Sequence, residues 1–92
     1  MAAMEKYFNS DIVFAGSNYH VQTEDWGDQN PFVVTRVFSS GTVVVSLKTP
    51  YEKLVDSGYA TGRQAVRLGM REQHQEVLDQ LVSGTLPLGS IK

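Results

Sequence analysis

The sequence contains no cysteine, which excludes disulfide bonds, thiolate catalysis and any metal site built on sulfur ligands. It also has no long apolar run. The longest runs, Ile12 to Ala15 and Val43 to Val45, are far shorter than the roughly 20 residues that a membrane-spanning helix needs. The first residues show no apolar core of a signal peptide. We therefore expect a cytoplasmic protein with no membrane partner.

Clustered positive charge is missing as well. Eight Lys and Arg residues against ten Asp and Glu residues give a net charge of −2, whereas proteins that bind nucleic acid usually gather basic residues on one surface. Arg63, Arg67 and Arg71 fall four residues apart on an expected helix, but three acidic residues on neighbouring turns dilute that stripe. The stripe is therefore either a solvated helix face or a patch for an acidic partner, and nucleic acid is not the expected partner.

Catalytic signatures are absent too. The chain has no P-loop, no dinucleotide-binding fingerprint and no nucleophile elbow. His20 and His74 have no third ligand at a spacing typical of metal sites, and we expect His74 to lie at the edge of the core with one hydrogen bond. Glu24, Asp25 and Asp28 lie close together but do not follow the EF-hand pattern. We predict a protein that is not an enzyme and holds no metal or cofactor.

What the chain does contain is enough for one small folded domain over residues 1–92, with 41% hydrophobic residues. Residues 1–10 and 85–92 are expected to be loosely ordered ends. Gly16 and Asn18 are expected to take positive φ in a turn over 15–18, and Ser39 to Gly41 form a three-residue hairpin connection. Alternating apolar residues between the turns predict four strands, at 12–14, 19–25, 32–38 and 42–48.

A short helix is expected directly after the strands. Thr49 would cap it, Pro50 would take its first position, and Glu52 would reach back to the capping residue. Gly58 would end it. This pattern places the first helix next to the last strand.

A longer helix is expected from Thr61, as its cap, to Gly84, which would end it. Gly69 in its middle predicts a close contact with the sheet. The sequence thus predicts an α+β fold: a four-stranded antiparallel β-meander, a short helix, and a long C-terminal helix packed on one sheet face. The apolar stripe of the long helix consists of Val66, Met70, Val77, Leu78, Leu81 and Val82.

The strands carry more apolar side chains than one helix can cover. Strict alternation places Val43, Val45 and Leu47 on one face of the fourth strand and Val44 on the other. On the third strand Val33, Thr35 and Val37 share one face. The opposite face would then expose an apolar patch, unless Tyr7 and Phe8 or the C-terminal tail fold over it. That patch consists of Phe32, Val34, Phe38 and Val44, with Arg36 and Trp26.

The segment from Tyr19 to Trp26 alternates like a strand and has polar and aromatic groups on both faces. Trp26 stands beside carboxylates at the start of an acidic, turn-prone loop, an arrangement typical of a recognition surface. The open edges of the sheet could also pair with a second copy in a homodimer. The predicted partner-binding residues are His20, Glu24, Asp25, Trp26, Asp28, Phe32, Val34, Arg36 and Phe38.

The heptapeptide Tyr19-His20-Val21-Gln22-Thr23-Glu24-Asp25 resembles the signature of a family of small bacterial proteins from gliding and predatory lineages. Weaker matches extend the resemblance over most of the chain, roughly residues 8–84. Within that group the chain is similar to the RomX-like polarity regulators. The resemblance implies partners, a RomR-like scaffold and an MglA-like, Ras-related GTPase, whose nucleotide exchange such regulators favour. It implies no particular contact residue. The matches outside the heptapeptide are Asn30-Pro31, Thr35, Val37-Phe38, Gly41, Tyr51, Met70, Gln73-His74, Leu78, Leu81 and Gly84.

We therefore expect a non-enzymatic protein-interaction module that regulates a small GTPase in cell polarity or motility. Two alternatives come from the residues themselves. One is a module for single-stranded nucleic acid that stacks bases on sheet aromatics. The other is a small-ligand enzyme that uses His20 with Glu24, which would need a true pocket. The aromatics available for stacking are Tyr19, Trp26, Phe32 and Phe38.

Overall fold

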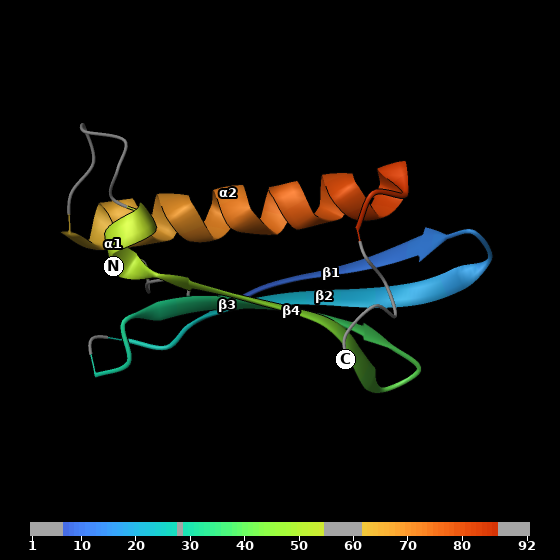
Figure 1. Cartoon of the computed structure of the whole chain (residues 1–92), viewed down its shortest axis with the longest axis horizontal. Coiled ribbons are helices and arrows are strands. Elements are labelled where there is room, and N and C mark those ends of the chain that lie inside the picture. Colours follow the sequence, from blue (N-terminus) through green and yellow to red (C-terminus); the bar gives the residue numbers. More distant parts are fainter. Residues whose placement is uncertain (1–6, 28, 55–61, 87–92) are drawn as a thin grey trace, which may run out of the picture.

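The expected α+β architecture is confirmed in a computed structural model, which describes residues 7–27, 29–54 and 62–86. Its four antiparallel strands neighbour one another in chain order. A short helix and a long helix follow, and the long helix α2 runs along one face of the sheet (Figure 1). The elements are β1 (Tyr7–Phe14), β2 (Ser17–Asp25), β3 (Phe32–Ser39), β4 (Thr42–Pro50), α1 (Tyr51–Leu54) and α2 (Gly62–Ser83).

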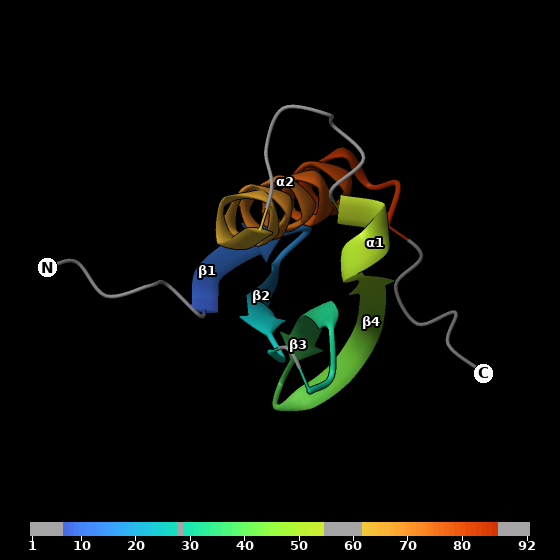
Figure 2. The ribbon, with the colours of Figure 1, turned by 90° about the vertical axis from the view of Figure 1, so that its left-hand side faces the viewer.

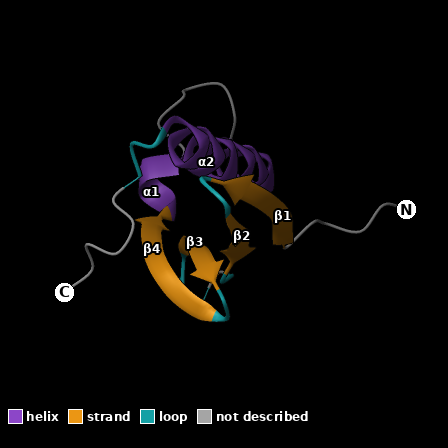
Figure 3. Ribbon diagram, turned by 90° about the vertical axis from the view of Figure 1, so that its right-hand side faces the viewer, coloured by secondary structure: helices purple, strands orange, loops and turns teal. Residues whose placement is uncertain are grey.

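The sheet is curved rather than flat. Seen along the helix, β1 lies beneath α2, while β4 bends up toward α1 on the other side (Figure 2). The opposite view shows the same curvature, with β1 and β4 at the two edges (Figure 3). We call the surface that α2 covers the helix face and the opposite surface the open face. Among the described residues, no helix or strand covers the open face.

Both outer hairpins turn on two residues. Ala15 and Gly16 join β1 to β2, and Ser40 and Gly41 join β3 to β4, all four with φ between 53° and 81°. Such double positive φ values define the turn type whose twist matches that of paired strands. The predicted longer connections are therefore wrong. Asn18 is a strand residue opposite Val13 and not the turn residue that we expected.

The first strand is longer than the sequence predicted. It begins at Tyr7, and its residues pair with β2 without interruption as far as Phe14. The expectation of a loosely ordered segment is thus wrong for residues 7–10. Phe8 packs against the core on the helix face, whereas Tyr7 lies opposite Glu24 at the edge of the open face and is 54% exposed.

The first helix begins later than the sequence predicted. β4 continues through Pro50, and the Tyr51 N–H that opens α1 donates to the Pro31 carbonyl at 2.9 Å. Thr49 is a strand residue whose hydroxyl donates to the Gln73 side chain, so the predicted cap is wrong. Gly58 and Thr61, the predicted end and start of the two helices, lie outside the described residues.

The end of α2 is as predicted. Gly84 has φ 78°, and the N–H groups of Thr85 and Leu86 both donate to the carbonyl of Gln80. A left-handed glycine directly after the helix closes its last turn in this way. Gly69, by contrast, has α1 rather than the sheet as its nearest neighbour. A Cβ added there would lie 2.8–2.9 Å from the nearest atoms of Leu54, so its close neighbour is α1.

The core consists of two apolar clusters separated by a polar layer. Most of the predicted helix stripe lies in these clusters, although Val82 is 52% exposed. The polar layer joins α2 to the sheet by hydrogen bonds, and no buried side-chain nitrogen or oxygen among the described residues lacks a partner. One cluster is Val21, Val37, Val45, Val77 and Leu81, the other is Val33, Val66 and Met70, and the layer between them is Thr23, Thr35, Gln73 and His74.

Candidate functional site: the open sheet face

Strand register places alternate residues of β2 and β3 side by side on the open face. His20 lies opposite Phe38, Gln22 opposite Arg36, and Glu24 opposite Val34. Their chain neighbours point to the helix face, where Val21, Val33 and Val37 are buried. The predicted alternation of these two strands is confirmed. It brings six of the nine predicted site residues onto one surface, namely His20, Glu24, Phe32, Val34, Arg36 and Phe38.

A bulge corrects the prediction for β4. The register shifts between Val37 and Phe38, so that Val45 lies opposite Val37 but Val43 lies opposite Phe38. Val44, the extra residue, packs against the core cluster on the helix face. A bulge reverses the facing of the residues before it. Val43 therefore takes the place on the open face that the sequence assigned to Val44.

At one end of the open face, Trp26 folds back over the sheet. Its indole N–H donates to a Glu24 carboxylate oxygen at 3.0 Å. The Lys48 ammonium lies 5.1 Å from the centre of the indole ring and 4.3 Å from the centre of the Phe32 ring. The Arg36 guanidinium carbon lies 5.8 Å from the indole ring. We call Glu24, Trp26, Phe32, Arg36 and Lys48 the tryptophan cluster.

The indole ring also explains a buried valine on this face. Val34 is only 3% exposed although it points away from α2. Glu24 and Lys48 are its direct cross-strand neighbours, and Trp26 contacts both of them. Val34 thus lies between two side chains that contact the indole, and it does not belong to an exposed patch. Trp26 itself remains 37% exposed.

Lys48 was not predicted as a site residue. Its position is set by its register opposite Val34, and a lysine in a predicted edge strand carries no signal of its own beyond solubility. Only the pairing of β3 with β4, together with the return of Trp26, reveals its contact with two aromatic rings. A positive charge over an aromatic face is attracted by the ring quadrupole.

Asp25 is directed away from the tryptophan cluster. One carboxylate oxygen accepts hydrogen bonds from the Gly27 N–H, at 2.9 Å, and from the Tyr51 hydroxyl. Asp25 thus ties the loop after β2 to α1, and its register partner Val33 belongs to the helix face. Its contribution to the site is to position the backbone that carries Trp26. Asp28 lies outside the described residues.

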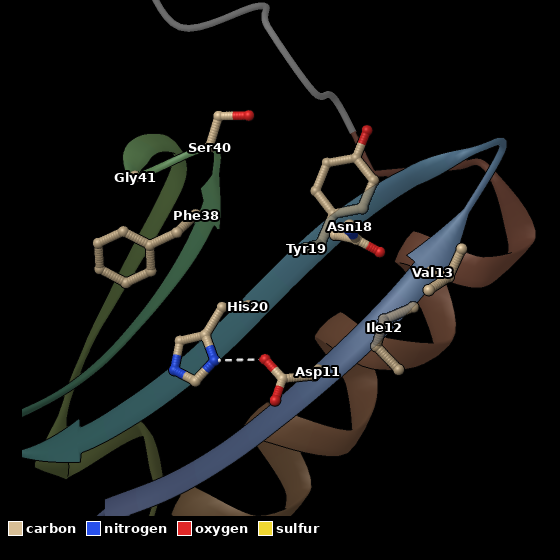
Figure 4. Close-up of a pocket in the computed structure, with 9 residues that line it drawn as sticks. All are labelled: Asp11, Ile12, Val13, Asn18, Tyr19, His20, Phe38, Ser40 and Gly41. Atoms are coloured by element: carbon tan, nitrogen blue, oxygen red, sulfur yellow. Dashed lines mark hydrogen bonds and ion pairs between the residues drawn. The ribbon is translucent and has the colours of Figure 1, made fainter.

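At the other end of the open face, His20 lines a cavity of ≈ 360 Å³ (Figure 4). Its Nδ1 lies 2.8 Å from an Asp11 carboxylate oxygen, its Nε2 lies 3.1 Å from the Asn9 side-chain oxygen, and its ring is 6.0 Å from that of Phe38. Both ring nitrogens are therefore engaged. The hypothesised pair of His20 with Glu24 is not assembled, because Glu24 instead accepts from Gln22 and Trp26.

The second histidine lies inside the protein. His74 makes two hydrogen bonds, to Thr23 at 2.8 Å and to Ser10 at 2.9 Å, where we expected one. Burial, and secondarily the charge of His20, lowers the pKa of His74. Among the described residues, no three histidine or acidic side chains lie close enough together to hold a metal ion.

Comparison of this chain with family models, with curated proteins and with solved structures finds no match. Within the described ranges, neither helix is long and apolar enough to cross a membrane. The geometry of the open face is therefore the basis for a functional assignment.

Proposed function

We propose that this protein is a non-enzymatic interaction module that binds a partner protein through its open sheet face. The observation that carries the proposal is the tryptophan cluster: a partly exposed indole held by Glu24 and flanked by Arg36 and Lys48, on a face that no described element covers. Tryptophan and arginine are the residues most enriched among those that dominate binding energy at protein interfaces.

The cluster is preorganised for contact. The indole N–H is fixed by Glu24, whose other oxygen accepts from Gln22 at 2.8 Å, and the Lys48 ammonium lies 5.1 Å from the centre of the ring. A partner would therefore meet an aromatic surface that loses little conformational entropy on binding. The adjoining positive charges of Arg36 and Lys48 favour a partner surface that presents carboxylates beside an apolar group.

The partner we propose, on the basis of the resemblance to RomX-like polarity regulators, is an MglA-like, Ras-related GTPase, with a RomR-like scaffold as a second partner. Such a module would favour nucleotide exchange by binding more tightly to the GTPase conformation that holds nucleotide poorly. That mechanism needs no covalent chemistry from this chain. It fits a site made of an aromatic ring and fixed charges.

The experiment uses the fact that Trp26 is the only tryptophan. Incorporation of 5-fluorotryptophan gives a protein with a single fluorine signal on the proposed surface. Titration with an MglA-like GTPase loaded with fluorescent GDP should shift that signal and accelerate release of the nucleotide. Arg36→Gln, measured by the fluorine signal, and Trp26→Leu, which lacks that signal and is measured by nucleotide release, should each weaken binding about tenfold or more.

Lys53→Gln, which removes an exposed positive charge on α1, is the matched control and should leave binding unchanged. Melting curves of each variant separate loss of the surface from loss of the fold. Absence of any fluorine shift and of any effect on nucleotide release would reject the GTPase as partner. A shift produced by single-stranded oligonucleotides, and weakened by salt, would favour the nucleic-acid alternative instead.

A further inference from the structure

The two edges of the sheet are protected to different degrees. β4 contains a bulge, ends in Pro50, carries Lys48 and continues directly into α1. Each of these features discourages another strand from pairing with an edge. β1 contains no proline, glycine or lysine, and its register with β2 is uninterrupted from Tyr7 to Phe14. Its outer side has no strand neighbour among the described residues.

β1 also exposes two apolar side chains at separated positions. Tyr7 is 54% exposed and Val13 is 72% exposed, and both are on the open face, in line with Asn9 and Asp11. Apolar groups this exposed at both ends of an unprotected edge are unusual, because such edges favour aggregation. An edge of this kind suits a specific strand partner.

The sequence of β1 identifies that partner, because it is self-complementary about Ser10. In both directions from Ser10 the chain shows one polar residue and then two apolar residues. An antiparallel copy centred on Ser10 would face polar groups with polar groups and apolar groups with apolar groups. The facing pairs would be Tyr7 with Val13, Phe8 with Ile12, Asn9 with Asp11, and Ser10 with Ser10.

We propose that two copies of this protein pair through β1 in this register, around a two-fold axis at Ser10, to form a continuous eight-stranded sheet (twice the four strands of one copy). On the open face, Tyr7 of each copy covers Val13 of the other, and the Asn9 amide donates to the Asp11 carboxylate. On the helix face, Phe8 of each copy contacts Ile12 of the other. Both residues already pack against the core clusters of their own copy.

Other registers fail on chemical grounds. A shift by one residue would place open-face side chains opposite helix-face ones and break the continuity of both faces. Centring the pair on Asp11 would set two carboxylates opposite each other, which is destabilising. Centring it on Asn9 would set Tyr7 against Asp11 and Phe8 against Ser10. Only the Ser10 register matches every pair.

The dimer would also bring the open faces of two copies together. A two-fold axis perpendicular to the sheet keeps both open faces on the same side, so two tryptophan clusters would point in one direction. A bivalent surface of this kind binds clustered partners more tightly than one copy does, by raising their effective concentration. The inference does not require the proposed GTPase contact, since no residue of the tryptophan cluster belongs to β1.

Sedimentation analysis over a concentration series from about 1 µM to about 500 µM tests the association, which we expect to be of micromolar strength because the interface is one strand wide. Tyr7→Lys and Val13→Glu should each raise the dissociation constant at least tenfold. The double variant, with both changes in one chain, should restore dimerisation through two lysine–glutamate pairs. Val82→Glu, which changes an exposed apolar residue on α2, is the matched control and should leave it unchanged.

Cross-linking tests the register. Because the sequence has no cysteine, any disulfide must come from the introduced residues. A mixture of the Asn9→Cys and Asp11→Cys proteins should form a disulfide-linked dimer under mild oxidation, because these positions face each other across the axis. Each protein alone should not, because the like positions lie too far apart for a disulfide. Cross-linking of either variant with itself would show a different register and overturn the assignment.

Two further results would also overturn the proposal. A protein that stays monomeric over the whole series would show that β1 does not pair with a second copy. A dimer that persists in both single variants would show that association uses another surface. Neither result would bear on the tryptophan cluster, whose test uses substitutions on β3 and in the loop after β2.

Discussion

His74 lies between α2 and the sheet, hydrogen-bonded to Thr23 and Ser10. Burial lowers the pKa of His74 from its ordinary value of 6.5, with a smaller contribution from the charge of His20. A neutral imidazole can donate through one nitrogen and accept through the other, which suits two hydroxyl partners. A second proton would force both nitrogens to act as donors in a site with little water.

This arrangement predicts that acid weakens the fold below about pH 6.5. The unfolded chain takes up a proton on His74 at its ordinary pKa of 6.5, while the folded chain resists until a lower pH. The unfolded state therefore binds more protons in that interval, and the free energy of unfolding falls as the pH falls through it. Urea denaturation between about pH 7.5 and 5 measures this slope.

His74→Gln should flatten the slope, because it removes the titrating group while leaving a side chain that can donate and accept. His20→Gln is the matched control and should retain most of it, because His20 lies on the open face and supplies only the smaller influence. Equal slopes in the original protein and in His74→Gln would contradict the assignment. The pH range ends at about 5, above the ordinary pKa of Asp and Glu of about 4, so that these carboxylates stay ionised during the measurement.

At the scale of elements, α1 and α2 meet where Gly69 faces Leu54. Gly69→Ala should favour helix formation in α2 by about 1 kcal/mol. The new Cβ would nevertheless lie 2.9 Å from the Cβ of Leu54, an atom fixed to the backbone of α1. Overpacking of this kind costs about 1–3 kcal/mol. We therefore expect a net loss of stability, measured by urea denaturation, from a substitution that usually stabilises a helix.

A double-mutant cycle isolates this contact. In a Leu54→Gly background the Cβ and the rest of the obstructing side chain are both absent, so Gly69→Ala should become less harmful or stabilising. A coupling energy of about 1 kcal/mol between the two positions would fit the structure. An unchanged effect of Gly69→Ala in both backgrounds would show that the helices do not meet there.

The elements that the sequence predicted well are those in which apolar and polar residues alternate without interruption. β2 is of this kind, since His20, Gln22 and Glu24 alternate with residues of the helix face, of which Val21 and Thr23 are buried. β4 is not. Three consecutive valines, Val43 to Val45, offer no polar residue to mark which of them is the bulge. The reversal of Val43 and Val44 follows from pairing with β3, which the sequence does not encode locally.

The beginning of β1 was missed for a related reason. Asn9 and Ser10 are typical of loops, and only their positions opposite Gln22 and Val21 make them strand residues. In the candidate site, too, local alternation predicted some features, and contacts between distant residues determined the others. Alternation assigned the side chains of β2 and β3 to one face, whereas Lys48 entered the site through its contact with an indole that returns from a loop. Alternation also did not predict that Val34 is buried on that face.

At the scale of the whole molecule, the polar layer sets how α2 lies on the sheet. Gln73 donates to the Thr35 hydroxyl at 2.9 Å and accepts from Thr49, while His74 bonds to Thr23 and Ser10. Adjacent helix residues thus bond to all four strands, with Thr35 on β3 and Thr49 on β4. Apolar contacts alone tolerate sliding and rotation, whereas these bonds are satisfied in one position of the helix.

Thr35→Val tests this role, since valine has nearly the same shape as threonine but cannot bond. The Thr35 hydroxyl contacts both Gln73 and, at 2.7 Å, the Thr23 hydroxyl. Its removal leaves the Gln73 amide without its shorter bond in a buried site, which costs about 1–3 kcal/mol despite the added apolar area. Thr42→Val, an exposed change on β4, should stay within about 0.5 kcal/mol. Urea denaturation compares the two, and a Thr35→Val protein as stable as the original would mean that apolar packing alone seats the helix.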